Sequence, residues 1–250
     1  MKKLENLLNI TLFERSKNKI TLNETGKLTA ELALSLVRQE YELIERITAF
    51  HQSNSTISFA SNAPVPIYDI VPILNSHFSN MSVLSQLLEK KEDVITGLLQ
   101  DKYQLIALHV IPDVENLHIQ MYRKEQLYFS VPYSHPLAKK DKVSFQDIDG
   151  QNILLFSKIG FWLETCKKYL PNAHFLMMDE EEAFGNVIGS AAFPFFTSDY
   201  FVDPNFHSDN LKILPITDDF VSVSYYCICK EENYPKFQSI FHSLEQFDTT

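Results

Sequence analysis

The pattern of hydrophobic and polar positions divides the chain into three stretches. The first reads as the tail of a helix over Lys3–Leu8, followed by two short strands at Leu12–Glu14 and Lys19–Leu22. Between the strands stands a polar tetrapeptide, Arg15–Asn18, which is a plausible hairpin turn. This stretch is too short to bury a core of its own.

A long helix is predicted next, from about Glu24 to Gln52. Asn23 precedes it and can cap it, because its side chain can accept a hydrogen bond from the first free N–H groups. No proline interrupts the segment, and apolar residues recur at spacings of 4, 7, 4 and 3. This stripe consists of Leu32, Leu36, Leu43, Ile47 and Phe50. It fits a helix that lies on its own domain or one that pairs with a second copy. We favour pairing, because Gln39, Glu40 and Arg46 leave the remaining faces polar.

After a polar break at residues 52–55, predicted strands and helices alternate. Strands are expected at residues 56–60, 82–88 and 104–110, and helices at residues 67–78 and 92–99. Further apolar runs follow at residues 126–131, 152–156, 175–178, 193–196 and 221–229, and a last amphipathic helix at residues 234–247. This alternation is typical of parallel βαβ units and predicts the α/β class.

Composition and charge limit the class of protein and the partners that it can bind. The 250 residues are 45% hydrophobic and 22% charged, which is ordinary for a globular protein. No apolar run approaches the roughly 18 residues that cross a bilayer, and no apolar signal segment is seen, so we expect a cytoplasmic protein. The net charge of −10 is uneven, with +3 on residues 1–30 and −11 on residues 51–250. A polyanion would be tolerated only at the N-terminal end.

Nothing in the sequence favours an enzyme or a metal protein. The nucleophile, phosphate-loop, zinc-protease and dinucleotide motifs are all absent, so we expect no catalytic residue and no cofactor. Cys227 and Cys229 lie two apart in a strand, and Cys166 stands alone; without a Cys or His cluster, buried small residues are favoured over a redox or metal site. The acidic run Asp179–Glu182 fits a solvated helix start better than acid–base chemistry.

At the N-terminus the residues resemble a known family. The run Leu4–Arg15, LENLLNITLFER, is similar to the "LE..LG..LF.R" of LysR-type transcriptional regulators, and Ile20–Gly26 is similar to their "..LT.aG". Further along, Ser134–Ala138 resembles the family's "..HPLA", and Val187–Thr197 stands where the family has "V.aG.GIa.LP". The order and spacing of these motifs over the whole chain carry the resemblance.

Some positions depart from the family pattern. Asn9 replaces a glycine, which is tolerable because asparagine also adopts left-handed conformations. Gln104 replaces an aspartate, and Ser190, Ala192 and Thr197 replace two glycines and a proline, which argues for a divergent effector specificity. The largest departure is the beginning, because Met1 falls in the middle of the family's recognition helix.

The resemblance implies a domain plan. Residues 1–23 would be the remnant of a winged helix-turn-helix, and residues 24–54 the linker helix through which the chain forms a homodimer or tetramer. Residues 55–250 would form a two-lobed, type 2 periplasmic-binding-protein-like effector domain. Its lobe I would take residues 55–126 and 230–250, and its lobe II residues 127–229, with crossovers near residues 126–132 and 222–229.

The cleft between such lobes would bind a small effector, which we expect to be an anionic metabolite. The candidates lie where predicted strands end or loops face the cleft: Ser61, Asn62, Lys91, Asp93, Ser157, Phe161, Phe196 and Thr197. For each of them a structural role is an open alternative. For Ser61 and Asn62 it is capping of the next helix, and Asp93 is expected to be the N-cap of the helix at residues 92–99. His109 ends a strand at the same edge but was left out, because a lone histidine is more often structural.

Rival functions remain open at this point. A ligand-capture protein of the same fold would carry a secretion signal and lack the linker helix. A decoy that forms mixed dimers with intact regulators would keep the linker helix and lose DNA reading. An enzyme on this fold, of prephenate-dehydratase type, has no supporting motif.

The N-terminal residues yield a first prediction. Helix-turn-helix proteins read bases with the N-terminal part of the recognition helix, which this sequence lacks. The basic residues Lys2, Lys3, Arg15, Lys17 and Lys19 can contact phosphates, which position a protein without specifying sequence. The 250-residue chain alone should therefore bind DNA without sequence selectivity. Titration of promoter and scrambled DNA checks this, and nanomolar selective binding would contradict it.

Overall fold

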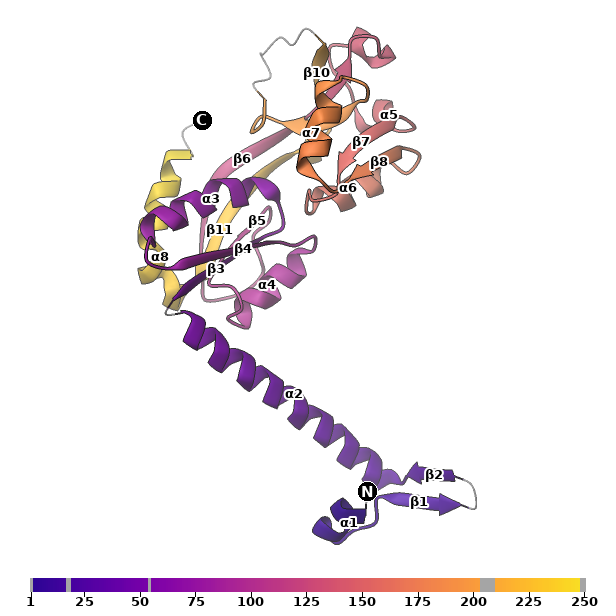
Figure 1. Ribbon diagram of the computed structural model, residues 1–250, viewed down its shortest axis with the longest axis vertical. Helices are drawn as coiled ribbons and strands as arrows, with labels where there is room; N and C mark the ends of the chain where they lie inside the picture. The colour runs from indigo at the N-terminus through magenta and orange to yellow at the C-terminus, as the bar shows by residue number, and fades with distance from the viewer. Residues whose placement is uncertain (1, 17–18, 54, 203–209, 248–250) are drawn as a thin grey trace. The chain divides into compact units, whose positions relative to one another are not determined.

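The structure is a computed structural model that describes residues 2–16, 19–53, 55–202 and 210–247. The chain divides into two units, Met1–Gln52 and Ser53–Thr250. Each unit has its own secondary structure (Figure 1) and is treated separately below.

The first unit contains a short helix, a hairpin and a long helix. Helix α1 (Lys2–Leu8) is followed by the antiparallel strands β1 (Phe13–Ser16) and β2 (Lys19–Leu22), and helix α2 spans Glu24–Ser53. All four elements agree with the sequence prediction to within two residues at each end. Asn9 ends α1 with φ +54°, the left-handed conformation expected of this residue.

Asn23 caps α2 as predicted and also fastens it to the preceding segment. Its side-chain oxygen accepts a 2.8 Å hydrogen bond from the Gly26 N–H, and its amide nitrogen donates to the Thr11 carbonyl at 2.8 Å. The Glu5 carboxylate accepts a 2.8 Å bond from the Leu12 N–H. Together these bonds join α1, the hairpin and the start of α2 without a large core.

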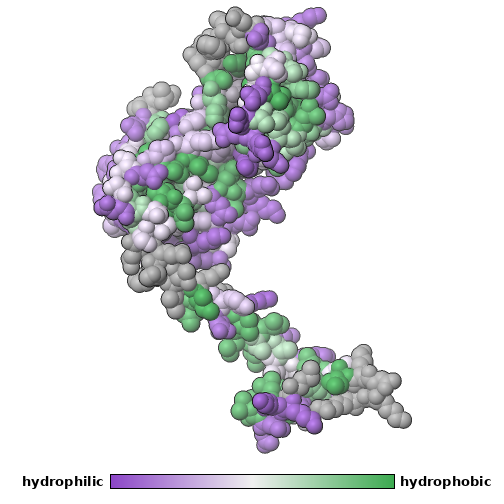
Figure 2. All heavy atoms as spheres, in the orientation of Figure 1, coloured by the Kyte–Doolittle hydropathy of each residue, from purple (hydrophilic) through white to green (hydrophobic). Residues whose placement is uncertain are grey.

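The surface of α2 is unusually apolar, and Figure 2 shows the apolar patches along it. Leu32, Leu36 and Leu43 of the predicted stripe are 58–69% exposed, whereas the side chains of Ile47 and Phe50 lie outside the described part. A second exposed apolar set recurs at helical spacing on another face: Leu34, Val37, Tyr41 and Ile44. The expectation that the remaining faces are polar was therefore wrong.

In the second unit, the first lobe is built from βαβ units as predicted. Its sheet has the order β4–β3–β5–β11–β6, in which β3 pairs in parallel with β4 and β5. The elements are β3 (Thr56–Ser61), α3 (Pro64–His77), β4 (Ser82–Leu87), α4 (Lys91–Leu99), β5 (Leu105–Leu108), β6 (Leu117–Pro132), β11 (Ser222–Lys230) and α8 (Tyr234–Leu244).

Helices cover both faces of this sheet, which explains why its central strands are apolar throughout. Successive side chains of a strand point to opposite faces. On β5, Leu105 and Ala107 join the core that includes α3 and α8, while Ile106 and Leu108 join the core that includes α4. All four are fully buried, as expected for parallel strands covered on both sides.

Strand β6 is shared by the two lobes. Its residues 117–126 pair with β11 in the first lobe, and its residues 127–132 pair with β9 and β10 in the second. The second lobe adds α5 (Phe145–Ile148), β7 (Asn152–Phe156), α6 (Trp162–Tyr169), β8 (His174–Met178), α7 (Glu181–Gly189), β9 (Phe195–Ser198) and β10 (Leu211–Pro215). Short 3-10 turns lie at Pro136–Lys139, Asp219–Val221, Glu231–Asn233 and Glu245–Phe247.

The pairing of β11 moves one expected boundary. Tyr226–Ile228 of β11 pairs with β5, and the whole strand pairs with β6. The strand therefore lies in the sheet of the first lobe, and the crossover from the second lobe falls near Ser222 and not at residue 229. A bulge at Tyr122 of β6 interrupts the register opposite Tyr225 and Tyr226.

The cysteines and the acidic run behave as the sequence suggested. Cys166, Cys227 and Cys229 are buried and free, and burial raises the pKa of the Cys166 and Cys229 thiols to about 12. The acidic run starts α7 and is exposed at Glu180–Glu182. Within the described ranges there is no cluster of metal-binding side chains and no helix long and apolar enough to cross a membrane.

Candidate functional site

The candidate site lies where the edge of the first-lobe sheet meets the second lobe. Ser61 ends β3 and Asn62 follows it, and both side chains are fully buried. The Ser61 hydroxyl accepts a 3.0 Å hydrogen bond from the Ala63 N–H. Neither residue caps α3, because the N-cap is Ala63 and Pro64 occupies the first turn. The alternative role considered for Ser61 and Asn62, capping of α3, is therefore wrong.

His109 joins the site because β3 and β5 are parallel neighbours whose carboxyl ends meet at one edge. Ser61 is in register with Ala107, so His109 lies close to Asn62. The Asn62 amide nitrogen is 2.8 Å from Nδ1 of His109. Burial and then the nearby Lys91 ammonium lower the pKa of His109 to about 4. The ring is therefore neutral near pH 7, and its Nδ1 accepts a hydrogen bond from the side-chain amide N–H of Asn62.

The second lobe is attached at this same point by the loop before α6. The Phe161 N–H donates a 2.8 Å hydrogen bond to the Asn62 carbonyl, and the Phe161 ring stacks on His109 with centroids 3.7 Å apart. Gly160 makes the approach possible, since its φ is +61° and a Cβ there would lie 2.1 Å from the Asn62 oxygen. Phe161 is only 9% exposed, so the first lobe buries it.

Beside this contact lies an open pocket of about 190 Å³ that both lobes line. Its walls are Pro64, Ile67 and Tyr68 of α3, Leu87 at the end of β4, Phe156 at the end of β7, Lys158, and Glu181 at the start of α7. Burial and then the Glu181 carboxylate raise the pKa of Tyr68, so this negative charge lies near the Tyr68 hydroxyl. The pocket thus combines an apolar wall with one cation and one anion.

Of the eight expected effector residues, the structure brings three together. Ser61, Asn62 and Phe161 meet at the contact between the lobes. Ser157 is half-buried, and its N–H donates to the Met178 carbonyl at 2.9 Å. Lys91 and Asp93 are exposed on α4, which begins at Lys91, so Asp93 is not the N-cap that we expected.

The last two expected residues lie in β9, away from the pocket walls. The Phe196 ring packs on Phe129 and Phe145, with centroids 5.1 Å and 5.6 Å apart. Thr197 is 9% exposed and pairs with Tyr128 of β6. Their surroundings are those of the second-lobe core.

Sequence reasoning missed Tyr68, Lys158 and Glu181. Lys158 lies in the loop after β7, between Ser157 and Phe161, which are expected effector residues, but it is not itself among the candidates. Glu181 belongs to the acidic run that was assigned to a solvated helix start. A lysine directly after a strand and an acid at a helix start were the available signals, and each is common on ordinary surfaces.

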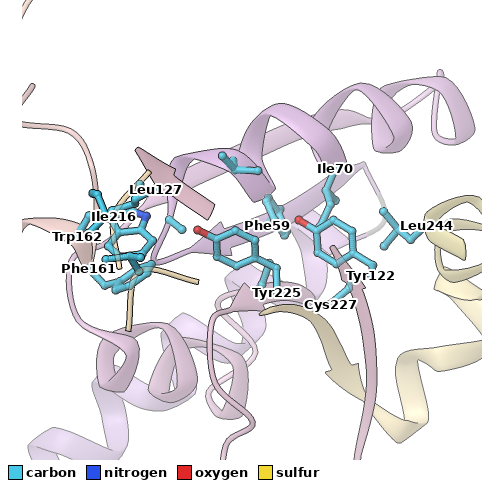
Figure 3. Packing of buried hydrophobic residues seen from close by; sticks show 14 of the residues in the cluster. Phe59, Ile70, Tyr122, Leu127, Phe161, Trp162, Ile216, Tyr225, Cys227 and Leu244 are labelled. Carbon is cyan, nitrogen blue, oxygen red and sulfur yellow. The ribbon is translucent and has the colours of Figure 1, made fainter. Parts of the chain in front are cut away.

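A buried carboxyl group lies behind the contact, where β6 passes from one lobe to the other. Glu125 is 3% exposed and accepts hydrogen bonds from the Tyr225 hydroxyl and from Nε1 of Trp162, the latter at 3.4 Å. Figure 3 shows the Tyr225 hydroxyl directed toward Trp162 and Phe161. Burial raises the pKa of Glu125, while the donated hydrogen bonds oppose that rise.

Comparison with known proteins gives the chain relatives of one kind. No family model matches it. It is 24% identical over 207 residues to the HTH-type transcriptional regulator AlsR of Bacillus subtilis, covering 76% of this chain and 65% of AlsR. It is 26% identical over 175 residues to the dual regulator GltC of the same organism, covering 66% of this chain and 58% of GltC. The chain thus spans less than two thirds of either relative.

Solved structures show the same fold. The regulatory domain of MetR, a LysR family regulator from N. meningitidis, superposes with a TM-score of 0.62 at 14% identity, over 77% of this chain and 94% of MetR. Full-length OxyR from Pseudomonas aeruginosa, in a cysteine-substituted variant, superposes with a TM-score of 0.56 at 15% identity. The match covers 98% of this chain and 83% of OxyR. The chain is a homologue of the LysR-type transcriptional regulators.

This homology confirms the expected α/β, periplasmic-binding-protein-like regulatory fold. LysR-type proteins are regulators and not enzymes, in agreement with the missing catalytic motifs. Of the expected DNA-contacting residues, Lys2 and Lys3 are exposed on α1. Lys17 and the side chains of Arg15 and Lys19 lie outside the described residues.

The contact between the lobes yields a second prediction. Gly160→Ala should lower the free energy of unfolding by roughly 1–3 kcal/mol more than Gly150→Ala, because only the first new methyl group would clash. Gly150 is the matched control, since its φ is also positive, at +84°, but nothing lies within 4 Å of a Cβ. Urea unfolding followed by the fluorescence of Trp162, the single tryptophan, measures both. Equal losses would contradict the contact.

Proposed function

We propose that this chain is the effector-sensing and self-associating part of a LysR-type transcriptional regulator acting in the cytoplasm. Residues 55–247 bind a small metabolite between the two lobes, and α2 pairs with α2 of a second copy. The observation that carries the proposal is the pocket of about 190 Å³, because residues of both lobes line it. A ligand there gains contacts only when the lobes are correctly placed, and so biases their arrangement.

The nature of the pocket supports a metabolite that bears a carboxylate. Lys158 supplies a positive charge, and the apolar side chains Ile67, Leu87 and Phe156 supply the wall that such sites usually have. Burial of the ligand against this wall strengthens the attraction between Lys158 and the carboxylate, because less water screens it.

The first test of this proposal is a thermal-shift screen of the full chain against small carboxylates, amino acids and aromatic acids. A ligand that binds only the native state stabilises it by roughly 2.7 kcal/mol at a hundredfold excess over Kd. The shift should vanish in Leu87→Phe, which fills the pocket. Leu84→Phe is the control, since Leu84 lies on the same strand but is 62% exposed and not part of the pocket. If no compound shifts the wild-type chain, the sensing function fails.

Self-association through α2 is the second part of the proposal. The exposed stripe that contains Leu32 and Leu36 is the surface that a second copy would cover, as in a coiled coil. A pair of such leucines buries apolar area that isolated α2 leaves in water. Binding to DNA, as the family does, would then need two chains, with the wing and α1 contacting phosphates.

The matching experiment measures the mass of the chain in solution by light scattering. The double variant Leu32→Glu with Leu36→Glu should be monomeric where the wild type is a dimer, because two negative charges replace the apolar contact. Arg38→Glu changes the net charge by the same amount at an exposed position of α2 outside this stripe and should stay dimeric. A double variant that remains dimeric would place the interface elsewhere.

A further inference from the structure

We propose that the pocket between the lobes takes a free α-amino acid with an apolar side chain. The inference rests on the proposed sensing function and narrows the ligand from a carboxylate to a zwitterion. It follows from the two charges that line the pocket, Lys158 from the loop after β7 and Glu181 from the start of α7.

Both charges are available to a ligand. Among the described residues, no salt bridge within 4.0 Å involves Lys158 or Glu181, and both side chains are exposed. Glu181 occupies the first turn of α7, the end of the helix at which a negative charge interacts favourably with the helix dipole. Burial and then the Glu181 charge raise the pKa of Tyr68, another pocket residue, so the carboxylate lies near the Tyr68 hydroxyl.

The two charges match the two ends of an amino acid. The ligand carboxylate pairs with Lys158 and its ammonium group with Glu181, and each pair is a charge-assisted hydrogen bond. The Tyr68 hydroxyl, next to Glu181, can accept a further hydrogen bond from the ammonium group. The remaining walls, Pro64, Ile67, Leu87 and Phe156, are apolar and suit an aliphatic or aromatic side chain.

Size and charge exclude the main alternatives. At about 190 Å³ the pocket is smaller than the ~300–1,000 Å³ of sites for drug-sized ligands, and it fits a metabolite of amino-acid size. A plain anion would meet Glu181 with its acidic neighbours Asp179, Glu180 and Glu182 close by in the sequence. A plain cation would leave Lys158 unpaired and repel it. Only a ligand that carries both charges can pair with both Lys158 and Glu181.

The experiment is calorimetric titration of the full chain with leucine, isoleucine, valine, methionine and phenylalanine. Each is compared with the acid that lacks its amino group and the amine that lacks its carboxylate. At least one amino acid should bind, and its acid and amine should each bind about tenfold or more weakly, because each loses one charge pair.

Two variants assign the charges. Lys158→Gln should weaken binding of the amino acid and of the acid but not of the amine, and Glu181→Gln should weaken binding of the amino acid and of the amine but not of the acid. Lys142→Gln and Glu115→Gln are exposed controls outside the pocket and should change nothing.

The outcomes separate this inference from the proposed function. If an acid binds as tightly as its amino acid and Glu181→Gln has no effect, the zwitterion is wrong while a sensing site for anions stands. The same holds if only carboxylates from the broader screen bind. If no small molecule binds at all, both proposals fail.

Discussion

The two lobes depend on one strand and on the carboxyl group buried within it. Strand β6 contributes to both sheets, and Glu125 lies just before the point where its pairing changes from β11 to β9. Burying a carboxyl group is costly unless donors satisfy it. Here the donors come from both sides, Tyr225 from β11 of the first lobe and Trp162 from α6 of the second. A shift of the lobes at this junction would therefore remove the Trp162 donor from the buried carboxyl group and leave only Tyr225.

This junction determines where ligand contacts are possible. With the lobes joined at Glu125, the loop before α6 reaches the edge of the first-lobe sheet, and the Phe161 N–H meets the Asn62 carbonyl. One end of the cleft is thereby filled by protein side chains, and the pocket lined by Lys158 and Glu181 remains beside it. Within the first lobe, Arg123 of β6 forms a 2.7 Å ion pair with Asp69 of α3. Arg123 also lies over the Tyr200 ring of the second lobe, 5.3 Å from its centroid.

The sequence predicted the elements that follow from a local pattern of apolar residues. It did not predict the features that depend on which strands pair and on how the two lobes meet. The strand Asn152–Phe156 was predicted to the residue, because a short apolar run of this length that closely follows a glycine is typical of a buried strand. The first half of β6, from Leu117 to Lys124, was missed, since its polar residues conceal the alternation until β11 is known to pair with it. Similarly, the edge of the parallel sheet predicted Ser61 and Asn62. Lys158 and Glu181 were missed because the pairing of two surface charges across a pocket depends on how the lobes meet.

The buried contact at Asn62 bears on what this domain can respond to. The backbone carbonyl of Asn62 accepts a hydrogen bond from the Phe161 N–H, and its side-chain amide nitrogen donates to His109, so Asn62 connects the two lobes, while its buried side-chain oxygen has no hydrogen-bond partner among the described residues. A histidine at such a contact would ordinarily make it sensitive to pH near neutrality. Because the pKa of His109 is lowered to about 4, the ring stays neutral and the contact persists down to distinctly acidic pH. Protonation of His109 is thereby removed as a signal near neutral pH, which agrees with the proposal that a ligand in the neighbouring pocket changes the balance between the lobes.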